Sequence, residues 1–174
     1  MTFQPGAGFD CGGMMMKIYT VSFFGHRIIQ DFSAAEEQVE DLVRNLLLEK
    51  DYVDFLVGRD GDFDQIVSST VKRLKRLVRD DNSSLIWVLP YPTAELRDNI
   101  DSFEKYYDDI EICNDAAGSH PKSAFQIRNR QMVDRSDMVA FYVDHKGGGA
   151  YQTMRYAKKN KKNIINLALR TGKE

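Results

Sequence analysis

A run of three glycines near the carboxyl end of the chain has the composition of a phosphate-binding turn. Lys146 and Gly147-Gly148-Gly149 precede a stretch with helical spacing that starts near Ala150. Glycine lets backbone approach an anion closely, and a helix N-terminus presents free N–H groups and positive partial charge. No acidic residue lies between Lys146 and Lys159, and Thr153 offers a hydroxyl in the first helical turn. The pattern predicts a phosphate cradle; the alternative is a flexible glycine hinge that caps the helix.

A second glycine turn, Gly58-Arg59-Asp60-Gly61-Asp62-Phe63-Asp64, has the opposite charge. Aspartates at a helix start stabilise the helix as caps and through its dipole, which alone suffices to explain them. If a ligand binds here, the carboxylates would accept hydrogen bonds from ribose hydroxyls and repel phosphate. Together the two turns therefore predict complementary halves of a nucleotide site.

The turn Phe24-Gly25-His26-Arg27 adds a guanidinium suited to phosphate or carboxylate. His26 is either an acid–base group or an ordinary packing residue. His120 and His145 also follow strands, but no His-x-x-x-His spacing is present, so we predict no metal site and no cofactor.

The segment before the fifth expected strand has Arg128, Met132 and Arg135 on one helical face. These residues indicate either a ligand-facing side or a helix with solvent-exposed arginines. The glycine–lysine motif of P-loop proteins, the Gly-x-Gly-x-x-Gly fingerprint and the Gly-x-Ser-x-Gly elbow are all absent from the sequence.

The elements that must position these turns alternate along the chain. Short runs of Val, Ile, Leu and Phe predict strands, and apolar residues three and four apart predict helices. Ser33, followed by Glu36 and Glu37, is the expected start of the first helix. The expected strands are Ile18–Phe24, Tyr52–Val57, Leu85–Leu89, Asp109–Ile112, Met138–Val143 and Asn163–Leu167. The expected helices are Ala34–Glu49, Phe63–Arg79, Ala94–Tyr106, Lys122–Arg135 and Ala150–Lys159.

Strand–helix alternation with short connections predicts an α/β fold: a Rossmann-like, doubly wound, mostly parallel sheet with helices on both faces. We expect a disordered leader over residues 1–16 and a single domain over residues 17–170. In such a sheet ligands bind where the carboxyl ends of strands meet helix N-termini, which is where the three turns fall.

Composition excludes several classes. The 24 Lys and Arg against 26 Asp and Glu give a net charge of −2, which favours no general attraction to nucleic acid. No apolar run approaches the roughly 20 residues that cross a bilayer, so we expect no membrane association. Two cysteines without a Cys-x-x-Cys pair predict no disulfide framework, and cytoplasmic localisation is the expectation.

Taken in chain order, four motifs resemble one known superfamily. They are Phe-Phe-Gly25-His26-Arg27; Val57-Gly58-x-x-Gly61-x-Phe63-Asp64; Arg128-Asn129-x-x-Met132 followed by Ser136-Asp137; and Gly-Gly-Ala-Tyr-Gln-Thr153. Over about residues 17–167 the chain is similar to the SLOG superfamily, which includes the LOG phosphoribohydrolases and DprA, and is closest to its YpsA-like branch.

This resemblance implies a Rossmann-like domain that binds a nucleotide or a nucleotide-derived ligand. The candidate ligand-binding residues are Gly25, His26, Arg27, Gly58, Gly61, Asp62, Asp64, Arg128, Met132, Gly147, Gly148, Gly149 and Thr153. The LOG signature Pro-Gly-Gly-x-Gly-Thr-x-x-Glu is broken here: Lys146 replaces its proline, and Tyr156 stands where its catalytic glutamate would be.

We therefore expect nucleotide binding or sensing without strong catalysis. One alternative is hydrolysis of an N-glycosidic bond, with Asp64 as the catalytic carboxylate. A second is single-stranded DNA binding like that of DprA, for which two basic runs are candidates, although nucleic acid is not the expected partner. A homodimer is a further expectation. The basic runs are Lys72, Arg73, Lys75, Arg76 and Arg79, and Lys158, Lys159, Lys161 and Lys162.

Overall fold

The computed structural model describes residues 15–171, which form one six-stranded parallel sheet with the order β4-β3-β2-β1-β5-β6. The strands are β1 (Ile18–Gly25), β2 (Tyr52–Val57), β3 (Ser83–Leu89), β4 (Asp109–Ile112), β5 (Met138–Tyr142) and β6 (Ile164–Asn166). The predicted parallel α/β architecture is confirmed, and every expected strand is present within a few residues of its expected ends.

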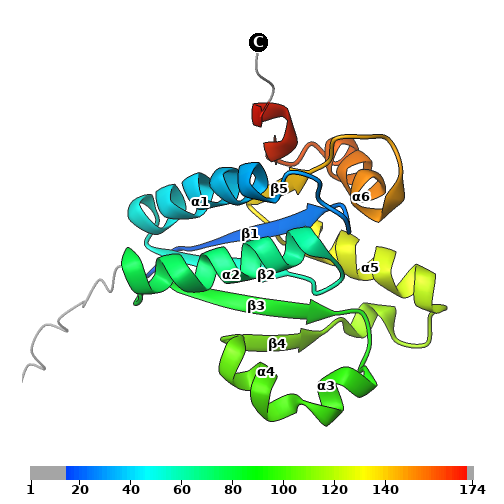
Figure 1. Cartoon of the computed structure of the whole chain (residues 1–174). Coiled ribbons are helices and arrows are strands. Elements are labelled where there is room, and N and C mark those ends of the chain that lie inside the picture. The colour runs from blue at the N-terminus through cyan, green and yellow to red at the C-terminus, as the bar shows by residue number, and fades with distance from the viewer. Residues whose placement is uncertain (1–14, 172–174) are drawn as a thin grey trace, which may run out of the picture.

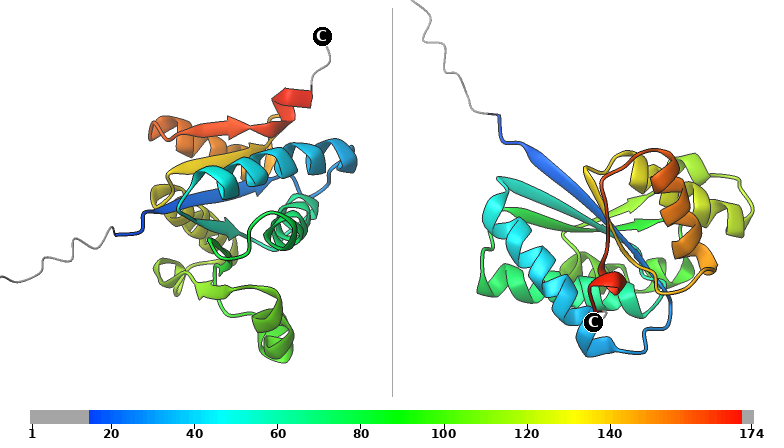
Figure 2. Two further views of the ribbon diagram at one scale, coloured as in Figure 1. Left: turned by 90° about the vertical axis from the view of Figure 1, so that its left-hand side faces the viewer. Right: turned by 90° about the horizontal axis from the view of Figure 1, so that it is seen from above.

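Helices cover both faces of this sheet (Figures 1 and 2). They are α1 (Phe32–Glu49), α2 (Asp62–Leu77), α3 (Ala94–Asp98), α4 (Ile100–Tyr106), α5 (Pro121–Asp134) and α6 (Gly148–Lys159), with 3-10 turns at Asn114–Ala116 and Leu167–Thr171. One apolar core joins α1, α2 and α4 to the sheet, and a second joins α5 and α6 to the opposite face.

The amphipathic spacing of the helices accounts for these cores. Along α1 the residues Val39, Leu42, Val43, Leu46 and Leu47 recur every three or four positions, and all are buried. The central strands β2 and β3 are buried on both faces, as continuous apolar runs predict for a covered parallel sheet. Helices and sheet therefore lock together through side chains that the sequence pattern already identifies.

Helix ends differ from expectation where a polar side chain sets them. Asp31, rather than Ser33, caps α1, because its carboxylate accepts the Ala34 N–H at 3.0 Å. The expected helix Ala94–Tyr106 is broken at Asn99, whose side-chain amide donates to the Glu95 carbonyl. Both cases show a short polar side chain competing for backbone hydrogen bonds.

No helix among residues 15–171 is long and apolar enough to cross a bilayer. Residues 1–14 of the expected leader lie outside the described part of the chain, so the leader and the 17–170 domain boundary remain predictions.

The strand order determines where the three glycine turns meet. β1 lies between β2 and β5, and all three run in the same direction. The chain passes from β1 by α1 to one side of the sheet and from β5 by α6 to the other, so a crevice opens between the carboxyl ends of β1 and β5. The phosphate-type turn and the aspartate turn therefore share one rim, as expected.

Candidate functional site

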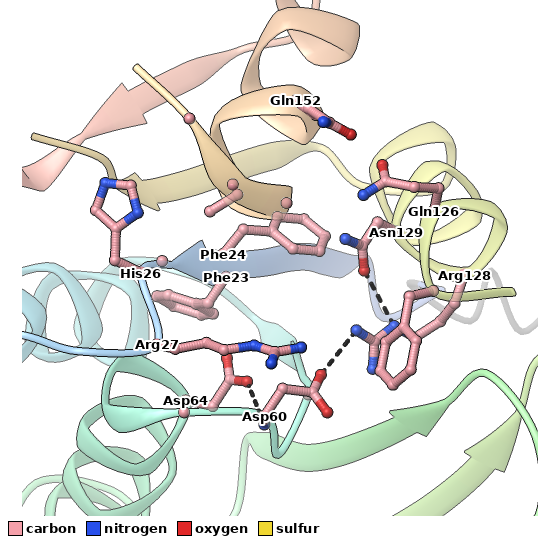
Figure 3. Close-up of a pocket in the computed structure, with 18 of the residues that line it drawn as sticks. Phe23, Phe24, His26, Arg27, Asp60, Asp64, Gln126, Arg128, Asn129 and Gln152 are labelled. Carbon is pink, nitrogen blue, oxygen red and sulfur yellow. Dashed lines mark hydrogen bonds and ion pairs between the residues drawn. The ribbon is translucent and has the colours of Figure 1, made fainter. Parts of the chain in front are cut away.

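A cavity of about 690 Å³ occupies this crevice, within the range typical of small-molecule sites. The turns after β1, β2 and β5 form three of its walls, and α5 forms the fourth (Figure 3). The structure brings these predicted residues to its lining: Gly25, His26, Arg27, Gly58, Gly61, Asp64, Arg128, Gly147, Gly148 and Gly149.

The turns after β1 and β2 are held together by backbone contact. A Cβ at Gly61 would lie 2.5 Å from the Arg27 Cα, which only glycine permits. The Asp62 N–H donates to the Arg27 carbonyl at 2.8 Å, and the Asp62 carboxylate accepts the Ile29 N–H at 3.0 Å. Asp62 was expected to bind ligand; instead it lies outside the lining and fixes the loop that carries Arg27.

The glycine turn before α6 is open to the cavity. Gly147 and Gly148 have φ values of 140° and 77°, which strongly favour glycine, and a Cβ at either would meet no other atom within 4 Å. Helix α6 starts at Gly148, two residues earlier than expected, and no side chain caps it. Its first N–H groups are therefore available to an anion.

Thr153 and Met132, both expected to bind ligand, are buried outside the cavity lining. The Thr153 hydroxyl donates to the Gly149 carbonyl at 2.9 Å and accepts from Asn129 at 3.1 Å. Met132 is fully buried in the core beneath α5 and α6. Neither lines the cavity, and Thr153 holds the Gly149 carbonyl from the interior.

Arg128 connects α5 to β3 and to the aspartate turn at the back of the cavity. Its guanidinium is nearly fully buried and donates to the Val88 carbonyl at 3.0 Å, to Asn129 at 3.0 Å and to Asp60 at 2.9 Å. Asp60 in turn donates its N–H to the Asp64 carboxylate at 2.8 Å. Arg128 is thus not a solvent-exposed helix arginine: its charge is paired, and it braces the back wall.

Several lining residues were not predicted, and four of them come from α5. Lys122, Phe125, Gln126 and Asn129 lie three or four residues apart, so they share one helical face with each other. This spacing could have indicated a common helical face. Because the face mixes charged, polar and aromatic side chains, however, the sequence did not indicate that it lines the cavity. The other unpredicted lining residues are Phe23, Phe24, Ile28, Asp60, His145, Ala150 and Gln152.

The cations of the cavity divide into a paired and an available set. Arg27 and Lys122 are exposed and form no salt bridge within the described residues, whereas Arg128 is paired with Asp60. Arg27 extends along the wall that holds Asp60 and Asp64 (Figure 3). Arg27, Lys122 and the N-terminus of α6 therefore face the same space as two carboxylates. Asp60 is paired with Arg128, and Asp64 forms no salt bridge within the described residues.

Asp64 is the unusual carboxylate of this wall. Burial raises the pKa of Asp64 from its ordinary 3.8 to about 6, although the Asp60 N–H and the charges of Arg128 and Arg27 act in the opposite direction. A carboxyl group that titrates near neutral pH can hold or release a proton under ordinary conditions.

We expect Asp64→Asn to stabilise the protein at neutral pH but not in acid. The native pKa exceeds the unfolded one, so native Asp64 binds more protons and stability falls as pH rises from about 4 to 6. Asparagine keeps an acceptor for the Asp60 N–H and removes this penalty. Urea titrations should show the variant gaining about 1–3 kcal/mol relative to wild type between pH 4 and 7.5. The exposed Asp41→Asn is the control; parallel pH profiles for Asp64→Asn and wild type would contradict the assignment.

His26 and His145 lie at the mouth of the cavity with Asp144. The two imidazole rings stack at 3.7 Å, and burial, together with neighbouring His145, lowers the pKa of His26 while Asp144 opposes the shift. His120 lies elsewhere, as the N-cap of α5, where its ring accepts the Lys122 N–H. Of the three histidines, His26 and His145 therefore lie in contact, and His120 lies apart from them.

Fold and site together define a Rossmann-like α/β protein with a cavity at the switch point of its sheet. The sequence matches no protein-family model and no curated protein. Solved structures of similar fold include the X-ray structure of DNA processing protein A (DprA) from Streptococcus pneumoniae, with a TM-score of 0.61 and 15% identity over 84% of this chain and 49% of that one.

A second similar structure is DprA from Helicobacter pylori, determined to describe its single-stranded DNA binding mode, with a TM-score of 0.58 and 17% identity over 84% of this chain and 63% of that one. The chain thus spans about half to just under two thirds of the DprA chains it matches. At these sequence identities the similarity shows a shared fold only. This agrees with the resemblance to the superfamily that includes DprA, which the sequence motifs indicated. The YpsA-like branch remains a prediction.

Proposed function

We propose that the cavity binds a nucleotide, with the phosphate on the uncapped N-terminus of α6. The observation that carries this proposal is the open Gly147–Gly149 turn, where backbone N–H groups face a cavity that also holds two unpaired cations. Gln126 and Gln152 lie on the same side of the cavity and add neutral donors (Figure 3). An anion there meets donors and no carboxylate from α6.

The opposite wall suits the uncharged part of a nucleotide. Asp64 offers carboxylate oxygens that accept hydroxyl hydrogens, and Phe125 offers apolar surface to a sugar or base. Because Arg128, Asn129 and Asp60 are already bonded to one another, this wall is rigid before a ligand arrives. The cavity is therefore preorganised for a ligand that is anionic at one end and hydroxylated at the other.

The test is calorimetric titration with nucleoside monophosphates and, as matched controls, the nucleosides that lack the phosphate. We expect the monophosphates to bind at least about tenfold more tightly, because charge-assisted hydrogen bonds contribute about 1.5–3 kcal/mol each. Equal affinity for nucleoside and nucleotide would place the phosphate outside the cradle and contradict the proposal.

Single-stranded DNA is the second candidate ligand, supported by the fold shared with DprA, of which one structure was solved for its single-stranded DNA binding mode. The comparisons favour this candidate over a free nucleotide. In that case the cavity would hold one nucleotide unit of a strand. The basic run of α2 does not extend the site, because Lys72, Arg73 and Lys75 bond to acceptors within the protein.

Fluorescence polarisation of a labelled oligothymidylate over a series of salt concentrations separates these candidates. A strand that contacts several phosphates loses affinity steeply with salt, with a slope of about −0.7 per neutralised phosphate. Tight oligonucleotide binding that free nucleotides fail to compete would favour the strand. If a mononucleotide displaces the oligonucleotide, and the salt dependence corresponds to about one neutralised phosphate, the free nucleotide is favoured.

Asp64 also allows a direct test of hydrolysis. Its raised pKa and its place on the hydroxyl-binding wall are what a group that activates water at an N-glycosidic bond requires. Release of free base from a nucleoside monophosphate, lost in Asp64→Asn, would support that catalytic role. Turnover that survives the substitution would exclude Asp64 from it.

A further inference from the structure

At the mouth of the cavity three metal-ligating side chains from distant parts of the sequence converge. His26 follows β1, and Asp144 and His145 follow β5. Their candidate ligand atoms all lie within 4.8 Å of one another. The Asp144 Oδ1 is 3.3 Å from His26 Nε2 and 2.5 Å from His145 Nδ1, so a single carboxylate oxygen faces both imidazoles.

The contacts of this cluster bring two lone-pair acceptors, His26 Nε2 and Asp144 Oδ1, side by side. The Asp144 N–H donates to His26 Nε2 at 3.3 Å, so that nitrogen presents a lone pair. The same nitrogen faces the Asp144 Oδ1, which is also a lone-pair acceptor. If Nε2 carried the proton instead, its N–H would face the backbone N–H of Asp144, and two donors would oppose each other. In either tautomer one contact is repulsive. A cation bound by both Nε2 and Oδ1 relieves the lone-pair repulsion between these two atoms and takes the place of the Asp144 N–H as the partner of Nε2.

The cluster combines one fixed ligand with two adjustable ones. The side chain of His26 is buried, and its backbone N–H donates to the Tyr142 carbonyl at the carboxyl end of the sheet. The side chains of Asp144 and His145 are more than half exposed. The exposed His145 ring can therefore turn out of its stack with His26 to direct its lone pair at a shared ion.

We propose that His26, Asp144 and His145 form a binding site for a divalent transition-metal ion such as Zn²⁺. Two imidazoles and a carboxylate are a donor set for first-row transition metals, whereas Mg²⁺ and Ca²⁺ prefer oxygen ligands. Three protein ligands leave at least one coordination position open. Since His26 and His145 line the cavity, that position would open toward the space that the Gly147–Gly149 turn also lines.

A phosphate held on this turn would supply the remaining ligand; this step alone rests on the proposed nucleotide function. The ion would then add positive charge beside the α6 N-terminus and tighten binding of the anionic end of the ligand. The metal site itself depends only on the three side chains.

The experiment is titration of the full chain with Zn²⁺ by calorimetry, and with Co²⁺ by visible absorbance, in the absence of nucleotide. We expect one ion per chain, with an affinity that falls by more than about tenfold in His145→Ala and in Asp144→Asn, since loss of a mere supporting contact already costs 10–100-fold. His145 is exposed, so its removal should leave folding intact, as circular dichroism would verify. His120→Ala, which removes a histidine outside the cluster, should bind as wild type does.

No binding, or binding that is unchanged in His145→Ala, overturns the metal site. Nucleotide affinity measured with and without Zn²⁺ separates this result from the proposed function. A protein that binds nucleotide but no metal refutes only the metal site, and one that binds metal but no nucleotide refutes only the nucleotide function.

Discussion

Replacing Arg128 with leucine is expected to lower the free energy of unfolding by about 3–5 kcal/mol, a large part of the stability of a typical domain. The guanidinium is almost completely buried and makes three hydrogen bonds. Its removal leaves the Val88 carbonyl and Asn129 without a donor and Asp60 without its countercharge. The loss arises from stranded partners more than from the missing bonds themselves.

Urea unfolding monitored by circular dichroism measures the effect. Arg130→Leu is the matched control: it lies on the same helix, is exposed and contacts the ring of Tyr156, so we expect a change within about 0.5 kcal/mol. Adding Asp60→Asn to Arg128→Leu should recover part of the loss, because it removes the unpaired carboxylate. Similar losses for the Arg128 and Arg130 variants would show that the buried network contributes little.

Replacing Gly148 with aspartate is expected to weaken the binding of nucleoside monophosphates by about 100-fold or more. The new carboxylate would stand at the uncapped start of α6, in space that is open in the structure. Two like charges about 4 Å apart near a protein surface repel by up to about 4 kcal/mol, and each 1.4 kcal/mol is a factor of ten in affinity.

Gly148→Asn is the control that isolates the charge. Asparagine has nearly the same shape, and both residues tolerate positive φ better than other side chains, so backbone strain at φ 77° is matched. We expect the asparagine variant to bind more tightly than the aspartate variant by at least about tenfold. Equal calorimetric affinities would mean that the phosphate lies away from this turn. Added salt should narrow the difference, since exposed charges are screened.

The secondary structure could be predicted closely from the sequence because its signals are local. The stripe of Val39, Leu42 and Val43 places one face of α1 in the core whatever lies opposite it. The apolar run of β2 indicates a strand covered on both sides, and its bounds, Tyr52–Val57, match the prediction. Helix ends were less predictable, because Asp31 and Asn99 compete with equally suitable neighbours for the same backbone groups.

For the site, residue types predicted most of the turn residues that line the cavity but few of those on α5. The glycines and charges of the three turns follow strands whose carboxyl ends meet at one rim, and most of them line the cavity. Arg128 could be interpreted equally well as exposed, because its burial depends on Asp60, which is 68 residues away in sequence. Thr153 and Met132 were expected to bind ligand but lie outside the cavity lining and face the interior, since their polar and apolar partners come from α5 and the sheet.

The sequence by itself determined the parallel α/β class, the order of the elements and the chemical character of each glycine turn, because periodicity and backbone freedom are properties of neighbouring residues. The tertiary structure alone decided that α5 closes the cavity, that Arg128 is paired within the wall, and that His26 meets Asp144 and His145 across 118 residues of chain. These features depend on strand order and side-chain direction, and such long-range geometry is fixed only when the whole sheet has packed.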